Sequence, residues 1–277
     1  MSDARDQQER FLRDFHRRHP GVTARAFSRG RVAGGGSSYD ALARAVGPGV
    51  GRVVDLGCGD GALLAVLIAG GAAPAALVGV DLSRDELAAA AARRLGVGLV
   101  HARAQSLPLG DATTDVVVSH LAFTLMRDPD LVAAEVQRVL APSGRFVTVV
   151  GGGPRGDDAY AGAVELVLPA ARAAAAAGPA MPRLGEVRAR SDRGLCAIFA
   201  VERGWSALAI EELPVDLSGS PDEVWSTMST LYELDGVVAA EVDEVRARFL
   251  AACARWRRDD GAIACTMATR LVAATRV

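Results

Sequence analysis

The stretch VVDLGCGDG, residues 53–61, places three glycines and two acidic residues directly behind an apolar run. Its first residues predict the end of a strand buried on both faces, and the apolar run ALLAVLI at 62–68 predicts a helix. Gly57, Gly59 and Gly61 therefore occupy the tight turn between strand and helix. Glycine tolerates a positive φ in such a turn and lets backbone N–H groups approach a ligand closely.

Short apolar runs alternate with helical patterns from residue 52 to 150, which is typical of βαβ units on a parallel sheet. A helix is expected to begin after Ser83, which has the spacing of a capping box to Glu86. Another helical pattern fills much of 129–144. The predicted strands are 52–56, 76–81, 97–102, 115–119 and 145–150.

Two regions lie outside this alternation. Residues 1–50 hold a polar helix, a Gly/Arg-rich stretch and a short helix from Tyr39 to Val46, and together they predict a helical lid. Residues 151–205 show little strand pattern and predict a helical insertion over the C-terminal edge of the sheet, where α/β proteins bind ligands. Strand pattern returns at 206–217 and in the run IACTMATRLVAATR.

Composition narrows the class of protein and its partners. The 277 residues carry a formal net charge of −2 with acids and bases interleaved, which argues against nucleic acid as a partner. The four cysteines form no CxxC pair and no signal-peptide pattern is visible, so we expect a cytoplasmic protein. The Ala-rich segment 161–181 contains charged residues and proline and predicts a helix rather than a membrane span. The histidines have no acidic partners at ligand spacing, so we expect no metal site.

Two classes of cofactor are candidate ligands of the glycine loop. Nicotinamide dinucleotides are bound by G-x-G-x-x-G, whereas this loop is D-x-G-x-G-x-G. Asp55 at the strand end would repel a pyrophosphate and attract a cation, and S-adenosylmethionine carries two cationic groups and no phosphate. The carboxylate therefore favours S-adenosylmethionine, and a nicotinamide oxidoreductase is the weaker alternative.

Side chains at the ends of the next two strands also suit a nucleoside. Asp81 ends the strand at VGVDLS, where a carboxylate can accept hydrogen bonds from both ribose hydroxyls. Ala104 and Gln105 follow the third strand, and their backbone and amide groups can pair with an adenine edge. An adenosine across these strand ends is the consistent prediction.

The motifs VVDLGCGDG, VGVDLS, RAQSLPLGDATTDVVVSHLAFTLM and VAAEVQRVLAPSGRFVTVV, in this order and spacing, resemble those of class I S-adenosylmethionine-dependent methyltransferases that act largely on small molecules. The resemblance covers about residues 50–150. It implies a Rossmann-like α/β fold with a seven-stranded, mostly parallel sheet whose last strand is antiparallel. Residues 1–50 would then form a helical lid, and 51–277 the methyltransferase domain, in which 151–205 forms part of the acceptor pocket.

The same resemblance assigns the cofactor site. Asp55, Gly57 and Gly59 would hold the methionine end, and many relatives carry an acid that meets the adenine amine where this chain has Arg103. We expect the backbone N–H of Cys58 to be useful in the loop, with its thiol unreactive. The full set of expected cofactor-binding residues is Tyr39, Asp55, Gly57, Cys58, Gly59, Asp81, Leu82, Ala104, Gln105 and Ser119.

One histidine is a candidate catalytic residue. His120 follows the fourth strand beside the expected methyl sulfonium, so it would take a proton from an attacking hydroxyl or amine; the alternative is a packing role. Tyr160, Trp225 and Tyr232, with His120, are the candidate lining of the acceptor pocket.

The predicted function is transfer of a methyl group from S-adenosylmethionine to an oxygen or nitrogen of a small organic acceptor, such as a secondary metabolite. The alternative is a protein that binds this cofactor but has lost methyl transfer, and acts as a scaffold or catalyses another reaction. We expect a small-molecule substrate, no nucleic acid or membrane partner, and a monomer or homodimer.

Overall fold

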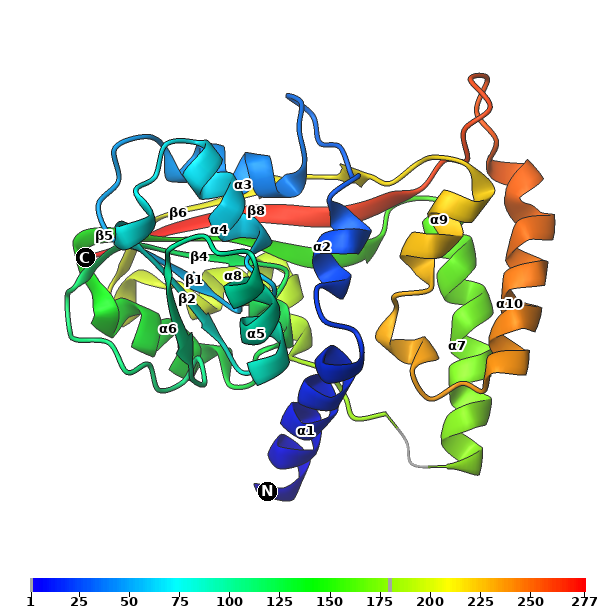
Figure 1. The fold of residues 1–277 in the computed structure, drawn as a ribbon, viewed down its shortest axis with the longest axis horizontal. Coiled ribbons are helices and arrows are strands. Elements are labelled where there is room, and N and C mark those ends of the chain that lie inside the picture. The colour runs from blue at the N-terminus through cyan, green and yellow to red at the C-terminus, as the bar shows by residue number, and fades with distance from the viewer. Residues whose placement is uncertain (1, 179–180) are drawn as a thin grey trace.

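The computed structural model describes residues 2–178 and 181–277, which fold around one mixed sheet of order β3-β2-β1-β4-β5-β8-β6 (Figure 1). The strands are β1 (Val53–Leu56), β2 (Leu77–Asp81), β3 (Gly98–His101), β4 (Thr114–His120), β5 (Leu140–Pro154), β6 (Trp205–Glu212), β7 (Val215–Asp216) and β8 (Thr266–Arg276). The first five strands are parallel, and β8 is antiparallel to β5, β6 and the short β7. The predicted Rossmann-like sheet with an antiparallel last strand is confirmed, with the two-residue β7 as an addition.

The fifth strand is longer than its sequence pattern predicts. β8 pairs with β5 from Arg145 opposite Thr275 to Pro154 opposite Met267, and this ladder extends the strand past residue 150. Its beginning at Leu140 also ends the preceding helix at Val139. Residues 151–154 are therefore part of the sheet and not of a helical insertion.

Helices cover both faces of the sheet, which explains why every residue of its central strand β1 is buried. The longer helices are α1 (Ser2–Arg18), α2 (Val22–Phe27), α3 (Ser38–Val46), α4 (Ala62–Ala69), α5 (Arg84–Ala92), α6 (Pro129–Val139), α7 (Ala159–Ala177), α8 (Asp192–Ile198), α9 (Pro221–Met228) and α10 (Ala239–Ala252). Val53, Val116 and Val118 face α3 and α4, whereas Val54 and Val117 face α6 and α8. The central parallel strands β1 and β4 are thus buried on both sides, whereas β3 at the edge is partly exposed.

Three helices form a separate cap at one end of the sheet. Figure 1 shows α7, α9 and α10 side by side beyond the strands, joined to them by the long β8. Their shared core contains Tyr160, Trp225, Phe249 and Trp256. In the described part of the chain, no helix is long and apolar enough to cross a membrane.

Residues 1–50, predicted to form one lid, divide into two parts that pack in different places. Leu42 and Val46 of α3 are buried in the core beside α4, so this helix belongs to the layer that covers the sheet. In Figure 1, α2 lies between the sheet and the cap, and α1 lies below α2. The predicted insertion, residues 151–205, is divided as well. Its helix α7 belongs to the cap, whereas α8 packs against the core of the sheet.

Candidate active site

A cavity lies at the carboxyl ends of β1, β2 and β4, with α1 on its outer side. Its empty space, including the solvent at its mouth, is about 1150 Å³, which is ample for a nucleoside-sized ligand. The predicted cofactor residues Tyr39, Asp55, Gly57, Cys58, Gly59, Asp81, Leu82, Ala104 and Gln105 all line it, as do His120 and Tyr232.

The glycine loop has the backbone that its sequence predicts. Gly57, Gly59 and Gly61 have φ values of 76°, 53° and 82°, which glycine adopts most readily. A Cβ at Gly57 would lie 2.4 Å from the Cβ of Ala122, so this position also needs the smallest residue. The sharp turn is therefore fixed by backbone conformation and by close packing.

The loop amides have partners inside the protein. The backbone N–H groups of Gly57 and Cys58 both donate to the carbonyl oxygen of Val80, at 2.8 and 3.0 Å. The Cys58 amide thus ties the loop to β2, while the residue itself lines the cavity. Burial raises the pKa of the Cys58 thiol well above its ordinary value, so it stays protonated.

Asp55, the last residue but one of β1, carries a buried carboxyl without a partner. Its side chain is 1% exposed, and neither carboxyl oxygen has a hydrogen-bond partner within the protein. Burial raises the pKa of Asp55 to about 8, and the nearby Asp81 carboxylate adds to the shift. A carboxyl placed in this way gains strongly from a cation in the cavity.

Asp81 organises the loop from the end of β2. Its Oδ2 accepts a hydrogen bond from the Gly59 N–H and its Oδ1 accepts one from the Ser83 N–H, each at 2.8 Å. Burial raises its pKa, and these two hydrogen bonds oppose the shift. The carboxylate thus holds the glycine loop and the start of α5 while it faces the cavity.

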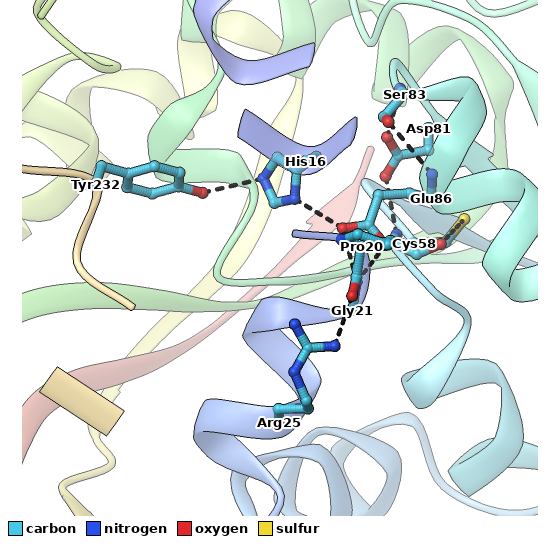
Figure 2. A network of polar contacts seen from close by, with 10 residues as sticks. His16, Pro20, Gly21, Arg25, Cys58, Asp81, Ser83, Glu86 and Tyr232 are labelled. Carbon is cyan, nitrogen blue, oxygen red and sulfur yellow. Dashed lines mark hydrogen bonds and ion pairs between the residues drawn. The ribbon is translucent and has the colours of Figure 1, made fainter. Parts of the chain in front are cut away.

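Glu86 does not complete the predicted capping box. The Ser83 hydroxyl accepts from the Glu86 N–H at 3.3 Å, which confirms Ser83 as the N-cap. The Glu86 carboxylate turns away from the cap, because its two oxygens share the Gly21 N–H in one bifurcated hydrogen bond, at 2.9 and 3.1 Å. It also contacts His16, whose Nδ1 lies 2.7 Å from Oε1 (Figure 2). Glu86 therefore anchors the end of α1 to α5.

The anchor continues into the cap. His16 Nε2 lies 3.1 Å from the hydroxyl of Tyr232, which belongs to the short 3₁₀ helix Tyr232–Leu234 (Figure 2). In the neutral imidazole, an Nδ1–H that donates to Glu86 leaves Nε2 to accept from the phenol. One chain of hydrogen bonds therefore joins the cap, α1 and α5 around the cavity.

The opposite wall of the cavity consists of the segments after β3 and β4. The Gln105 Nε2 donates to the carbonyl of Arg127 at 2.7 Å, and the Gln8 Nε2 donates to that of Leu125 at 2.6 Å. Arg103 forms an ion pair with Glu9 of α1. α1 is therefore attached to this wall as well as to α5.

His120 lies in the cavity wall under conditions that do not suit a base. Its Nε2 is 2.9 Å from the hydroxyl of Ser38, and its ring stacks on Tyr39 with the centroids 3.8 Å apart. Its Nδ1 is buried without a partner. Burial lowers the pKa of His120 to about 3, which corrects the premise of an ordinary imidazole that titrates near neutrality. The geometry favours a neutral ring with a packing and orienting role.

We expect the imidazole of His120 to show no titration between pH 5 and 8. The folded protein must keep the ring neutral while the unfolded chain can protonate it, so stability should fall as pH drops from about 6.5 towards 3. His120→Ala should cost about 2–4 kcal/mol of stability by leaving a cavity beside Tyr39. NMR of the imidazole protons against pH tests the first point, and a midpoint between 6 and 7 would contradict it.

Three predicted site residues do not line this cavity. The Ser119 hydroxyl is fully buried in the sheet and donates to the carbonyl of Leu56 at 2.8 Å. Tyr160 and Trp225 are packed in the apolar core of the cap. Tyr232 is therefore the one cap aromatic of the three candidates that reaches the cavity.

The sequence reasoning missed Gln8, His16, Glu86 and Arg127 as lining residues. A signal for Gln8 exists, because it precedes Leu12 by four positions and Phe15 by seven and so shares their helix face. The contacts of Glu86 with Gly21 and His16 were not predicted, because its spacing to Ser83 indicated a capping box instead.

Comparison with known proteins finds similarity over the segment that carries the glycine loop. A methyltransferase domain model matches residues 54–148. The malonyl-[acyl-carrier protein] O-methyltransferase of Methylococcus capsulatus is 36% identical over 115 residues, or 40% of this chain and 41% of that protein. The chain spans about two fifths of the length of the curated relatives that it matches.

Solved structures share the fold at low sequence identity. The YcgJ protein of Bacillus subtilis has a TM-score of 0.56 at 18% identity, covering 86% of this chain and 97% of that one. The [4+2]-cyclase SpnF has a TM-score of 0.51 at 21% identity, covering 86% and 79%. The strand order and the glycine loop with its two carboxylates agree with the methyltransferase domain matched over residues 54–148, and over this part the chain resembles class I S-adenosylmethionine-dependent methyltransferases.

Proposed function

We propose that the protein transfers a methyl group from S-adenosylmethionine to an oxygen or nitrogen of a small organic acceptor. The observation that carries the proposal is the Asp55 carboxyl, which is buried and unpartnered directly below the glycine loop. An unpaired buried carboxyl is costly. A ligand that brings a cation to this point removes the cost, and a pyrophosphate would increase it.

The residues of the cavity fit the cofactor. Asp55 suits the ammonium of its methionine end, and Asp81 retains acceptor capacity for ribose hydroxyls beside its two bonds to the loop. Ala104 and Gln105 would border the adenine. When bound, S-adenosylmethionine supplies a methyl group on a sulfonium, which is already activated for in-line displacement.

The chain's own contribution is then alignment and exclusion of water. α1 and Tyr232 enclose the cavity, and the neutral His120 ring fixes Tyr39 by stacking and Ser38 by hydrogen bonding. Orientation of this kind can supply much of a rate enhancement without a base. An acceptor that ionises easily, or an amine already neutral in solution, suits such a site best. A secondary metabolite of this type is the proposed acceptor.

A second candidate is that the protein binds the cofactor and catalyses another reaction. Two observations favour it: the histidine in the cavity wall has a pKa far below neutrality, and one structure with this fold is a [4+2]-cyclase. The fold alone does not select between these reactions.

Titration calorimetry and a methyl-transfer assay test the proposal. We expect S-adenosylmethionine and S-adenosylhomocysteine to bind and NAD not to bind. Labelled S-adenosylmethionine with a panel of phenols, carboxylic acids and amines should yield a labelled product. Cofactor binding without transfer to any panel member would favour the second candidate, and binding of NAD alone would refute both.

We propose that α1 and α2 form the movable cover of the cavity. Hydrogen exchange in residues 7–27 should slow on addition of S-adenosylhomocysteine, by up to about 100-fold at a concentration of 100 Kd. α7 should show no change, because it lies in the cap and does not line the cavity. Equal hydrogen exchange in α1 with and without ligand would contradict the proposal that α1 covers the bound cofactor.

A further inference from the structure

We propose that Gln8 of α1, together with Arg127, reads the adenine base of the cofactor, and so makes closure of α1 dependent on the identity of the base. The inference rests on the proposed function, because it concerns the same cavity. It assigns a specificity-determining role to a helix that precedes the sheet in the chain.

The orientation of the Gln8 amide is fixed by its partner. The side chain is 1% exposed, and its nitrogen donates to the Leu125 carbonyl at 2.6 Å. A carbonyl oxygen only accepts, so the NH₂ group must lie on that side. The Gln8 Oε1 therefore points elsewhere, and it is buried without a partner in a residue that lines the cavity. A buried acceptor in this state calls for a donor.

Gln8 lies at the adenine end of the cavity. Its anchor Leu125 is two residues from Arg127, whose carbonyl holds the Gln105 amide. The neighbouring Glu9 is paired with Arg103, which directly precedes Ala104. Both attachments bring this part of α1 against the segment proposed to border the base.

The unpartnered atoms on this wall match one edge of adenine. Gln8 Oε1 is an acceptor, and Arg127 Nε is a donor that is also buried without a partner. Adenine presents an exocyclic amine beside an unprotonated ring nitrogen, so it offers one donor and one acceptor side by side. The Gln105 nitrogen is occupied by the Arg127 carbonyl, which leaves its oxygen as a second acceptor on this wall, whereas the Arg103 guanidinium only donates and cannot accept from the amine.

Inosine reverses both requirements. It carries a carbonyl in place of the amine and a protonated ring nitrogen in place of the acceptor. The Gln8 oxygen would then face a carbonyl, and the Arg127 Nε would face an N–H. A site built for hydrogen bonding rejects such an analogue strongly, because its own buried groups stay unpaired.

The test is calorimetric binding of S-adenosylhomocysteine and S-inosylhomocysteine to the protein and three variants. The wild type should prefer the adenosyl ligand by about 100-fold or more. Gln8→Leu should reduce this preference at least about tenfold, mainly by weakening the adenosyl ligand. Gln8→Glu keeps an acceptor for the base but loses the donor to Leu125, so it should weaken both ligands while it retains part of the preference for the adenosyl ligand. Gln7→Leu is the matched control, because Gln7 is exposed one position away, and it should behave as wild type.

The ratio of the two affinities separates recognition from a merely structural role. If Gln8→Leu weakens both ligands equally, or leaves both unchanged, Gln8 does not read the base and the inference is overturned. If the wild type binds neither ligand, the proposed function itself fails. Wild-type binding of S-adenosylhomocysteine with loss of selectivity only in Gln8→Leu supports both.

Discussion

Asp55→Asn is expected to weaken S-adenosylhomocysteine binding by about 10- to 100-fold, while the ligand-free protein becomes more stable at pH 8–9. The loss of affinity follows from removal of the buried, unpartnered carboxyl that we propose to meet the ammonium of the methionine end. Hydrogen bonds to a charged group are worth roughly 1.5–3 kcal/mol, and each 1.4 kcal/mol is a factor of ten.

The gain in stability follows from the raised pKa. The folded protein holds the Asp55 proton up to a pKa of about 8, whereas the unfolded chain releases it near the ordinary 3.8. Between these values the folded state binds more protons, so stability falls as pH rises, and above pH 8 the full cost of the buried charge is present. The cost is on the order of several kcal/mol, at about 1.4 kcal/mol per pKa unit. Asparagine cannot ionise and avoids it.

Thermal unfolding from pH 5 to 9 measures this effect. The wild type should lose stability relative to Asp55→Asn as pH increases, with most of the difference present by pH 8. Asp85→Asn is the control, since Asp85 is exposed on the first turn of α5. Parallel curves for wild type and Asp55→Asn would show that the carboxyl is already ionised in the free protein.

The same residue couples ligand binding to protons. Below pH 8 the free site holds a proton that a cationic ligand should displace, so affinity is expected to increase with pH up to about 8. Titrations in two buffers of different ionisation enthalpy would detect the released proton. Asp55→Asn should release none.

Asp81→Ala is expected to reduce affinity for S-adenosylhomocysteine by about 100- to 10,000-fold. Two charge-assisted hydrogen bonds to the ribose would disappear, at roughly 1.5–3 kcal/mol each. The bonds from Gly59 and Ser83 would disappear too, so the loop should lose its order in the free protein. Calorimetry measures the affinity, and amide exchange at Gly59 measures the order of the loop.

A matched variant separates these two contributions. Asp81→Asn keeps one acceptor oxygen, so it should preserve one loop bond and give an intermediate affinity. Asp85→Ala, on the exposed side of α5, should leave affinity unchanged. If Asp81→Ala bound the ligand as the wild type does, the adenosine could not lie across the end of β2 as proposed.

Much of the fold could be predicted because its signals are local. The strands from β1 to β4 follow short apolar runs, and the positive φ values at Gly57, Gly59 and Gly61 follow from their place between a strand and a helix. Asp55 and Asp81 lie at the ends of neighbouring parallel strands, so their meeting at one edge of the sheet was also foreseeable. The length of β5 was not, because β8 is far away in sequence.

The candidate site was less predictable because its details depend on distant contacts. The Cys58 amide and the Ser119 hydroxyl are occupied by carbonyls of neighbouring strands. The pKa of His120 is set by burial under α3, which adjacent residues do not reveal. Gln8 has a place in the cavity only because α1 reaches Leu125.

The attachment of α1 also bears on the order in which the protein folds. Its contacts join residues far apart in sequence, Gln8 with Leu125 and His16 with Tyr232, and closing such long loops costs chain entropy. Of its described side chains, only Gln8 and Phe15 are buried. The sheet can therefore form first, and α1 should detach at a free energy well below that of global unfolding. Docking of α1 would then be the final step of folding, and cofactor concentration would set the fraction of molecules whose N-terminal segment resists proteases.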